Sequence, residues 1–214
     1  RIKSFSLGVA MSALPISRQY REDVDLAGHL AVRARVFLDI WWVYEGATTR
    51  GKYLATMNRF SEFYRFDPHA HFVAMVMYLS QLFEPRGDTL NLPSLLENAP
   101  SAKVATSVTE QGRSILEAIK PLVSKVMILR SNLFAHRSAK LSYAEVFDLA
   151  KVTADQLREL SDAALRIANL LGEAAGVGEK IVHDLSPAHA EEVLKALANS
   201  HADTYPRNRQ RREA

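Results

Sequence analysis

The strongest structural signal in the chain is Val126-Met-Ile-Leu-Arg-Ser-Asn-Leu-Phe-Ala-His-Arg-Ser138, which places polar side chains in an otherwise apolar helical segment. Apolar residues leading into it recur at alternating steps of four and three, as on one face of an α-helix: Ile115, Ile119, Leu122, Val126, Leu129 and Leu133. At about 100° per residue, Arg130 and His136 lie roughly 60° to either side of Leu133. The pattern predicts a helix whose packing face carries a permanent cation and a side chain that titrates near neutral pH.

The rest of the chain also consists of periodic apolar segments separated by short breaks, which is typical of an all-α fold. Long helices are expected over residues 24–45, 67–83, 104–136 and 151–171, with shorter ones over 53–64 and 188–199. We therefore expect a single-domain helical bundle of about five long helices, with short terminal helices, over residues 22–200. Residues 1–21 are predicted to form an irregular N-terminal segment, and residues 201–214 a basic flexible tail.

Local signals indicate where several helices begin and end. Asp67-Pro68 predicts the start of the third helix, because Asp suits an N-cap and Pro the first turn. Pro121 is expected to kink the helix over residues 104–136 or to divide it in two. Ser142 and Glu145 have the spacing of a capping box, and Gly176 is expected to follow the end of a helix.

Composition excludes several classes of function. The 214 residues are 48% hydrophobic, enough to bury a substantial core in one domain. The chain has no cysteine, which excludes disulfides, thiolate catalysis and cysteine-bound zinc. No cofactor or metal is expected, because His69 and His71 would point about 200° apart on a helix. The net charge of +3 permits an anionic partner, and the absence of an apolar run long enough to cross a bilayer favours a cytoplasmic protein.

The segment from Arg130 to His136 resembles the Arg-x(4–6)-His motif of the HEPN superfamily, all-helical domains that include many metal-independent ribonucleases. Two further segments resemble the abortive-infection, AbiU-like branch of that superfamily. One is Phe83-Glu-Pro-Arg-Gly-Asp-Thr-Leu-Asn-Leu-Pro-Ser-Leu-Leu96, before the long helix, and the other is the run from Ala135 to Ser138. The resemblance extends from about residue 22 to about residue 175 and implies a HEPN-like helical domain.

This resemblance implies an endoribonuclease that cleaves RNA through attack by the 2′-hydroxyl group. Arg130 is then expected to bind the phosphate, because its guanidinium donates two hydrogen bonds and keeps its charge. His136 is expected to transfer protons, because its pKa lies near the working pH. Ser131, Asn132 and Arg137 are expected to support this pair, with Asn132 orienting His136 or holding a ribose hydroxyl.

The resemblance also implies a homodimer with a composite site where two protomers meet. A two-fold partner packed over Leu133 would bring both Arg130 and His136 pairs into one cleft. The biological role implied is phage defence, or the toxin of a toxin–antitoxin pair. RNA is then the substrate, and the expected protein partner is a nucleotidyltransferase-like antitoxin.

Two other interpretations follow from the residues themselves. Members of the superfamily often have Asn, Asp or His directly after the arginine, whereas this chain has Ser131 there and Asn132 next. That departure favours a non-catalytic helical dimer that binds RNA or a protein partner. In a simpler helical scaffold, Arg130, His136 and Arg137 would only stabilise the C-terminal end of their helix through its dipole.

Overall fold

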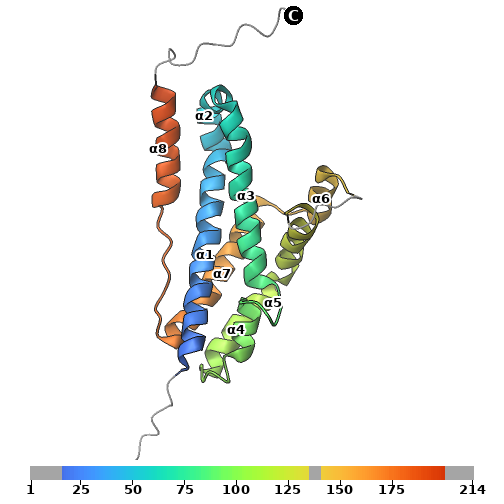
Figure 1. The fold of residues 1–214 in the computed structure, drawn as a ribbon, viewed down its shortest axis with the longest axis vertical. Coiled ribbons are helices and arrows are strands. Elements are labelled where there is room, and N and C mark those ends of the chain that lie inside the picture. The colour runs from blue at the N-terminus through green and yellow to red at the C-terminus, as the bar shows by residue number, and fades with distance from the viewer. Residues whose placement is uncertain (1–15, 135–140, 201–214) are drawn as a thin grey trace, which may run out of the picture.

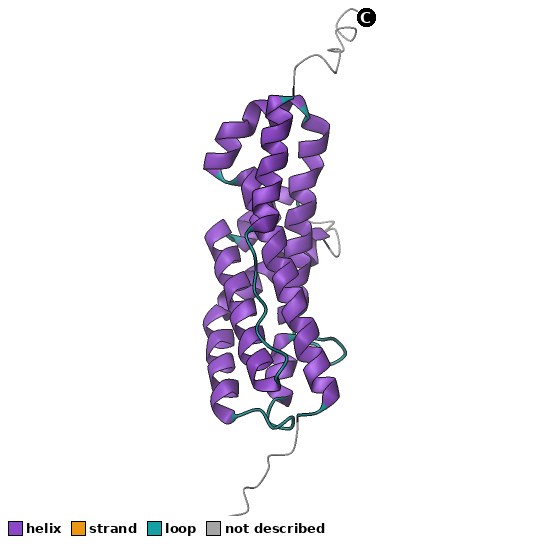
Figure 2. Ribbon diagram, turned by 90° about the vertical axis from the view of Figure 1, so that its left-hand side faces the viewer, coloured by secondary structure: helices purple, strands orange, loops and turns teal. Residues whose placement is uncertain are grey.

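The computed structural model describes residues 16–134 and 141–200, and every regular element in these ranges is helical (Figure 2). The predicted all-α fold is confirmed. In chain order the elements are α1 (Arg18–Glu45), α2 (Ala47–Arg59), α3 (Ser61–Phe83), α4 (Leu92–Asn98), α5 (Thr106–Leu129), a π-helical turn η1 (Arg130–Phe134), α6 (Tyr143–Ala150), α7 (Ala154–Ala175) and α8 (Leu185–Asn199).

The longest helix, α1, lies at the centre of an elongated bundle and packs along both α3 and α7 (Figure 1). Its buried face includes Ala27, Ala31 and Ala34, each with 0% of its surface exposed. Side chains this small let neighbouring helices approach closely, and larger apolar residues of the neighbours fill the remaining space. Fully buried examples are Leu79 in α3, Leu129 in α5 and Leu160 in α7.

The C-terminal helix α8 packs against the opposite end of the bundle from α4 (Figure 1). Leu194, fully buried, inserts into a second apolar cluster formed by Tyr44, Tyr53 and Met57. The connection before α8 runs along the bundle without regular structure (Figure 2), and Lys180 in it pairs with Asp25 of α1. The chain after α7 is therefore attached to the core by both polar and apolar contacts.

The predicted break at Asp67-Pro68 is wrong, because α3 begins at Ser61 and continues through Pro68. The division between α2 and α3 is a single residue, Phe60, with φ −105° and ψ 41°. Burial of Pro68 and Phe72 on the core side compensates for the hydrogen bond that the proline ring removes. Asp67 lies inside the helix and not at its cap.

Pro121 also lies inside a helix and does not divide α5. Because Pro121 is exposed, the backbone carbonyl that loses its partner one turn earlier can bond to water.

The first helix, α1, begins at Arg18 and so includes residues that were predicted to belong to the irregular N-terminal segment. Its N-cap is Ser17, whose hydroxyl accepts a hydrogen bond from the backbone N–H of Tyr20.

The capping predictions near the C-terminal half are confirmed. Ser142 and Glu145 form the expected capping box, and Gly176 ends α7 in the left-handed conformation with φ 71°. The expected helix over residues 151–171 begins later, at Ala154, because Lys151 is left-handed and Thr153 forms a second capping box. The last helix begins at Leu185, three residues before its predicted start.

Within the described residues, no helix has both the length and the apolar character needed to cross a membrane. The predicted tail over residues 201–214 and the first 15 residues lie outside the part of the chain that the structure describes.

Replacement of Leu129 by Ala should lower the free energy of unfolding by about 2–5 kcal/mol, because it leaves a cavity at the end of α5. Urea denaturation followed by circular dichroism measures this change. Leu149→Ala is the matched control, since Leu149 is 57% exposed and its loss should change stability by no more than about 0.5 kcal/mol. Equal effects of the two substitutions would contradict the packing described for α5.

Candidate functional site

The helix that carries the Arg130–His136 motif changes its hydrogen-bonding pattern where the motif begins. Regular α-helix ends at Leu129, and residues Arg130–Phe134 form the π-helical turn η1. The expected regular α-helix is therefore wrong over Arg130–Phe134, and its predicted last two residues lie outside the described part of the chain. Single π-helical turns are rare and are often found at functional sites, because they shift the side chains that follow them.

The side chain of Asn132 gives a local reason for the π-helical turn. Its Nδ2 donates a hydrogen bond of 2.9 Å to the backbone carbonyl of Ile128. In a regular α-helix that carbonyl would accept from the backbone N–H of residue 132 itself. The Asn side chain thus competes with its own backbone for this acceptor, a known property of Asn in helices.

Arg130 is held by an ion pair with Glu84. Its Nη1 lies 3.0 Å from Oε1 of Glu84, and each side chain is 24% exposed. Glu84 is the C-cap residue of α3, where the helix dipole disfavours a carboxylate. The guanidinium compensates for this unfavourable position, so the pair connects the C-terminal ends of α3 and α5.

Glu84 is the residue that the sequence reasoning missed. It belongs to the Phe83–Leu96 segment that resembles the AbiU-like branch, yet no role was predicted for it. The available signal was an acidic residue directly before Pro85, at the end of a helix where acids are unfavourable. Its pairing with Arg130 spans 46 residues and could not be read from local spacing.

Phe134, at the end of η1, packs against aromatic rings of α3. Its ring lies 6.0 Å from that of Phe72 and 6.1 Å from that of His69, both on α3. Phe72 also contacts Phe147 of α6, with ring centroids 5.8 Å apart. These contacts bring the end of the described motif to the middle of α3.

The remaining predicted site residues fall into two groups. Ser131 is exposed and Asn132 is half-buried, both within η1 and beside Arg130. His136 and Arg137 lie outside the described residues, so their geometry relative to Arg130 is not part of the structure. The structure therefore describes Arg130, Ser131 and Asn132 of the predicted site, which are consecutive in the chain, and their roles stay predictions.

The apolar stripe proposed as a dimer surface is used differently from the prediction. Leu129 is fully buried by its own chain, and Leu133 is half-buried against the same core. Leu129 is therefore not available to a second protomer. The homodimer itself stays a prediction.

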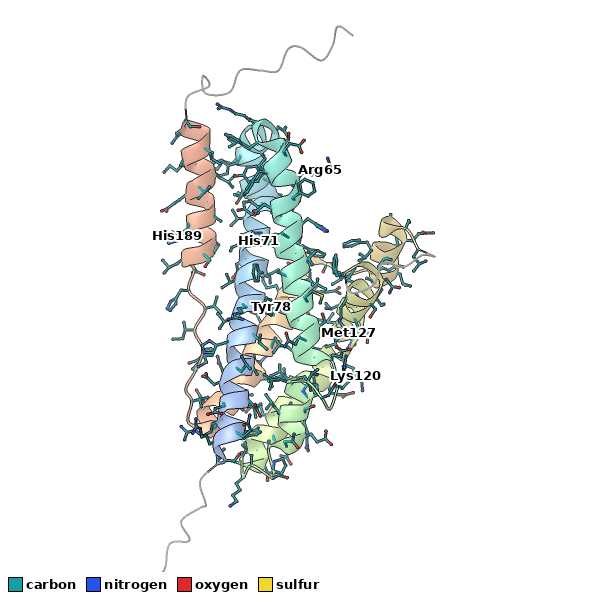
Figure 3. All side chains as sticks on the ribbon, in the orientation of Figure 1. Arg65, His71, Tyr78, Lys120, Met127 and His189 are labelled. Atoms are coloured by element: carbon teal, nitrogen blue, oxygen red, sulfur yellow. The ribbon has the colours of Figure 1, made fainter. Side chains whose placement is uncertain are left out.

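The histidines of His69-Ala-His71 lie in different surroundings. His69 is exposed and packs against Phe134. His71, labelled on α3 in Figure 3, is half-buried, and its Nδ1 lies 2.8 Å from the backbone carbonyl of Asp67. His71 also contacts Tyr44, and burial together with the Asp67 carboxylate raises the pKa of that tyrosine. Over residues 16–134 and 141–200, no cluster of three or more His, Asp or Glu side chains could hold a metal ion.

Arg130 has enough N–H donors to bind an anion while it keeps its ion pair with Glu84. A guanidinium has five N–H donors, and the ion pair with Glu84 uses Nη1 alone among the described contacts of Arg130. Arg130 can therefore remain bonded to Glu84 while it donates to a phosphate oxygen. Because it is only partly exposed, its charge is less screened than that of a surface arginine.

Comparison with known proteins supports the resemblance seen in the motif. No curated protein and no solved structure matches the chain. A family model described as AbiU2, of the HEPN class, matches residues 20–197, from α1 to α8. The match includes Glu84, Arg130 and His136 and extends further toward the C-terminus than the predicted limit near residue 175. The chain belongs to the AbiU2 branch of the HEPN superfamily.

Proposed function

We propose that the protein is a metal-independent endoribonuclease in which Arg130 binds the scissile phosphate and His136 transfers protons. The observation that supports this most is Arg130 itself, held at the solvent boundary by Glu84 within a π-helical turn. Membership of the HEPN superfamily adds independent support, because ribonuclease activity is common in that superfamily. The motif residues Arg130 and His136 lie in this chain at the spacing that the superfamily uses.

In the proposed reaction, the 2′-hydroxyl oxygen attacks the adjacent phosphorus while its proton leaves. The bond from phosphorus to the 5′-oxygen of the next nucleotide breaks, and that oxygen receives a proton. The products are a 2′,3′-cyclic phosphate and a free 5′-hydroxyl. His136 serves the proton transfers, and Arg130 stabilises the negative charge that grows on the phosphate oxygens.

Glu84 is proposed to position Arg130 for this role. A free arginine side chain has many rotamers, and fixing it in advance lowers the entropic cost of binding the transition state. The carboxylate also reduces the net positive charge at the site. The gain from positioning Arg130 exceeds the loss from this reduced charge when the arginine keeps N–H donors free for the phosphate. Its partial exposure allows this.

The biological role proposed is phage defence or the toxin of a toxin–antitoxin pair, acting on RNA in the cytoplasm. A homodimer would place two Arg130–His136 motifs in one cleft, and a nucleotidyltransferase-like protein is the proposed antitoxin. Growth arrest on expression, relieved by His136→Ala, would support the toxic activity.

A non-catalytic dimer that binds RNA or a protein partner is the second candidate. Two observations favour it: Ser131 follows Arg130 where relatives often have Asn, Asp or His, and Arg130 is already ion-paired. This candidate predicts RNA binding without cleavage, which separates it from the first.

Purified protein incubated with total RNA in EDTA should cleave it, because the proposed chemistry needs no metal. His136→Ala and Arg130→Ala should each slow cleavage on the order of 100-fold or more, by removing the proton-transfer group and the charge stabiliser. His189→Ala and Arg86→Ala are the matched controls, since both residues are exposed and lie outside the motif. Equal cleavage by all variants would point to a contaminant, and binding without cleavage by the native protein would favour the second candidate.

Glu84→Gln should slow cleavage roughly tenfold or more while the fold is retained, because the arginine loses its charged anchor. Single-turnover cleavage of a labelled RNA measures the effect, and thermal unfolding checks the fold. Asp88→Asn is the control, as Asp88 pairs with the exposed Arg86 in the same segment. Faster cleavage by Glu84→Gln would show instead that the carboxylate competes with the phosphate.

A further inference from the structure

The C-terminal helix α8 is attached to the bundle by far fewer buried residues than the helices of the main core. Of its 15 residues only Leu194 is buried, whereas α7 buries ten of its 22 residues. Two of its large apolar side chains, Leu185 and Val193, are 61% and 54% exposed. A helix of this length is marginal in water without packing, so α8 depends on the contacts that Leu194 makes.

The apolar contacts of α8 are separate from the main core. They form a second cluster that consists of Tyr44, Tyr53, Met57 and Leu194. In the described part of the chain, none of these side chains belongs to the continuous core between α1, α3, α5 and α7. The ion pair between Lys52 and Glu191 lies beside the cluster, but both side chains are exposed, and exposed ion pairs contribute little to stability. Release of α8 would therefore leave the main core closed.

The connection before α8 is attached to the bundle at Lys180. Its first residues donate backbone hydrogen bonds to carbonyls at the end of α7. The backbone of Lys180 forms hydrogen bonds of 2.8 and 3.1 Å with the side chain of Asn169 on α7, and its Nζ lies 2.5 Å from Oδ1 of Asp25 on α1. From Ile181, which is 65% exposed, the chain continues to α8 without regular structure (Figure 1).

The side chain of Lys180 crosses α1 directly over Gly28. A Cβ atom at position 28 would lie 2.8 Å from Cγ of Lys180, well inside the separation of about 3.5–4.0 Å at which carbon atoms pack. The glycine therefore makes room for the lysine, and a larger residue would displace the connection from α1. Gly51 of α2 provides a comparison, because a Cβ atom there would meet nothing within 4 Å outside its own helix.

We propose that residues 179–199 form a C-terminal arm that opens from the bundle as one cooperative unit, with Lys180 and Leu194 as its two attachment points. Segments with few buried apolar contacts open with a lower free energy than the core of a protein, and they do so in contiguous units. Opening of the arm uncovers the second apolar cluster without unfolding the helices that carry Glu84 and Arg130. This opening is independent of the proposed ribonuclease function.

Amide hydrogen exchange of the full chain tests the opening. Amides of α8 should exchange on the order of 100-fold or more faster than the most protected amides of α1 and α7, after correction for their intrinsic rates. Leu129→Ala lowers the free energy of global unfolding, so it should speed exchange in α1 and α7 but leave α8 unchanged. Leu194→Ala should speed exchange in α8 on the order of 30-fold or more.

Gly28→Ala tests whether the arm opens as one unit. It should displace Lys180 and so speed exchange in α8 on the order of 10-fold, although position 28 contacts the connection and not α8. Because alanine has a higher helix propensity than glycine, the substitution should not weaken α1 itself. Gly51→Ala is the matched control and should leave exchange in α8 unchanged. Acceleration confined to the residues around Lys180 would show that α8 frays by itself and would overturn the single unit.

The chain has no cysteine, which allows an independent measurement by thiol labelling. A thiol introduced by Met57→Cys lies beneath α8 and should react with a soluble disulfide reagent when the arm opens, at a rate that Leu129→Ala does not change. A thiol introduced by Met75→Cys lies in the main core, and Leu129→Ala should accelerate its labelling. Equal protection of α8 and the main-core helices, or equal acceleration of both by Leu129→Ala, would show that the chain unfolds as a whole and would overturn the proposal.

Discussion

The ion pair between Arg130 and Glu84 is the interaction on which the candidate site depends. It joins the C-terminal ends of α3 and α5 through two residues that are 46 positions apart in the sequence. Both charged side chains are only partly exposed to water. Removal of one partner would leave the other charge poorly solvated, and for Glu84 also at the unfavourable end of a helix dipole. The pair therefore places a cation at a defined point, where a flexible surface arginine would not stay.

The packing around this pair explains why the point is well defined. Leu129, directly before Arg130, is fully buried, and Phe134, at the end of η1, contacts two rings of α3. The π-helical turn is held between these two anchors, and the Asn132 side chain donates to the Ile128 carbonyl in place of its own backbone N–H. A functional side chain carried on rigid, packed elements can be positioned more exactly than one on a loop.

Much of this arrangement follows from local sequence patterns, and the rest depends on contacts between distant residues. Apolar periodicity predicted the helices and placed Leu129 on a packing face, and the capping residues Ser142 and Glu145 act as expected. The helix start predicted at Asp67-Pro68 is wrong because burial of Pro68 and Phe72 compensates for the hydrogen bond that a proline removes within a helix. The π-helical turn coincides with one side-chain hydrogen bond of Asn132, and Glu84, the partner of Arg130, lies on a distant segment. Neither feature leaves a periodic signal in the sequence.

The chemistry proposed for Arg130 and His136 requires that the RNA itself supply the nucleophile. The most direct test is an RNA oligonucleotide with a mapped cleavage site in which the nucleotide on the 5′ side of the cut is changed to its 2′-deoxy form. The account predicts that cleavage at that position stops, while the unmodified oligonucleotide yields a 2′,3′-cyclic phosphate. Continued cleavage of the deoxy-substituted RNA, leaving a 3′-hydroxyl or an uncyclised phosphate, would contradict it.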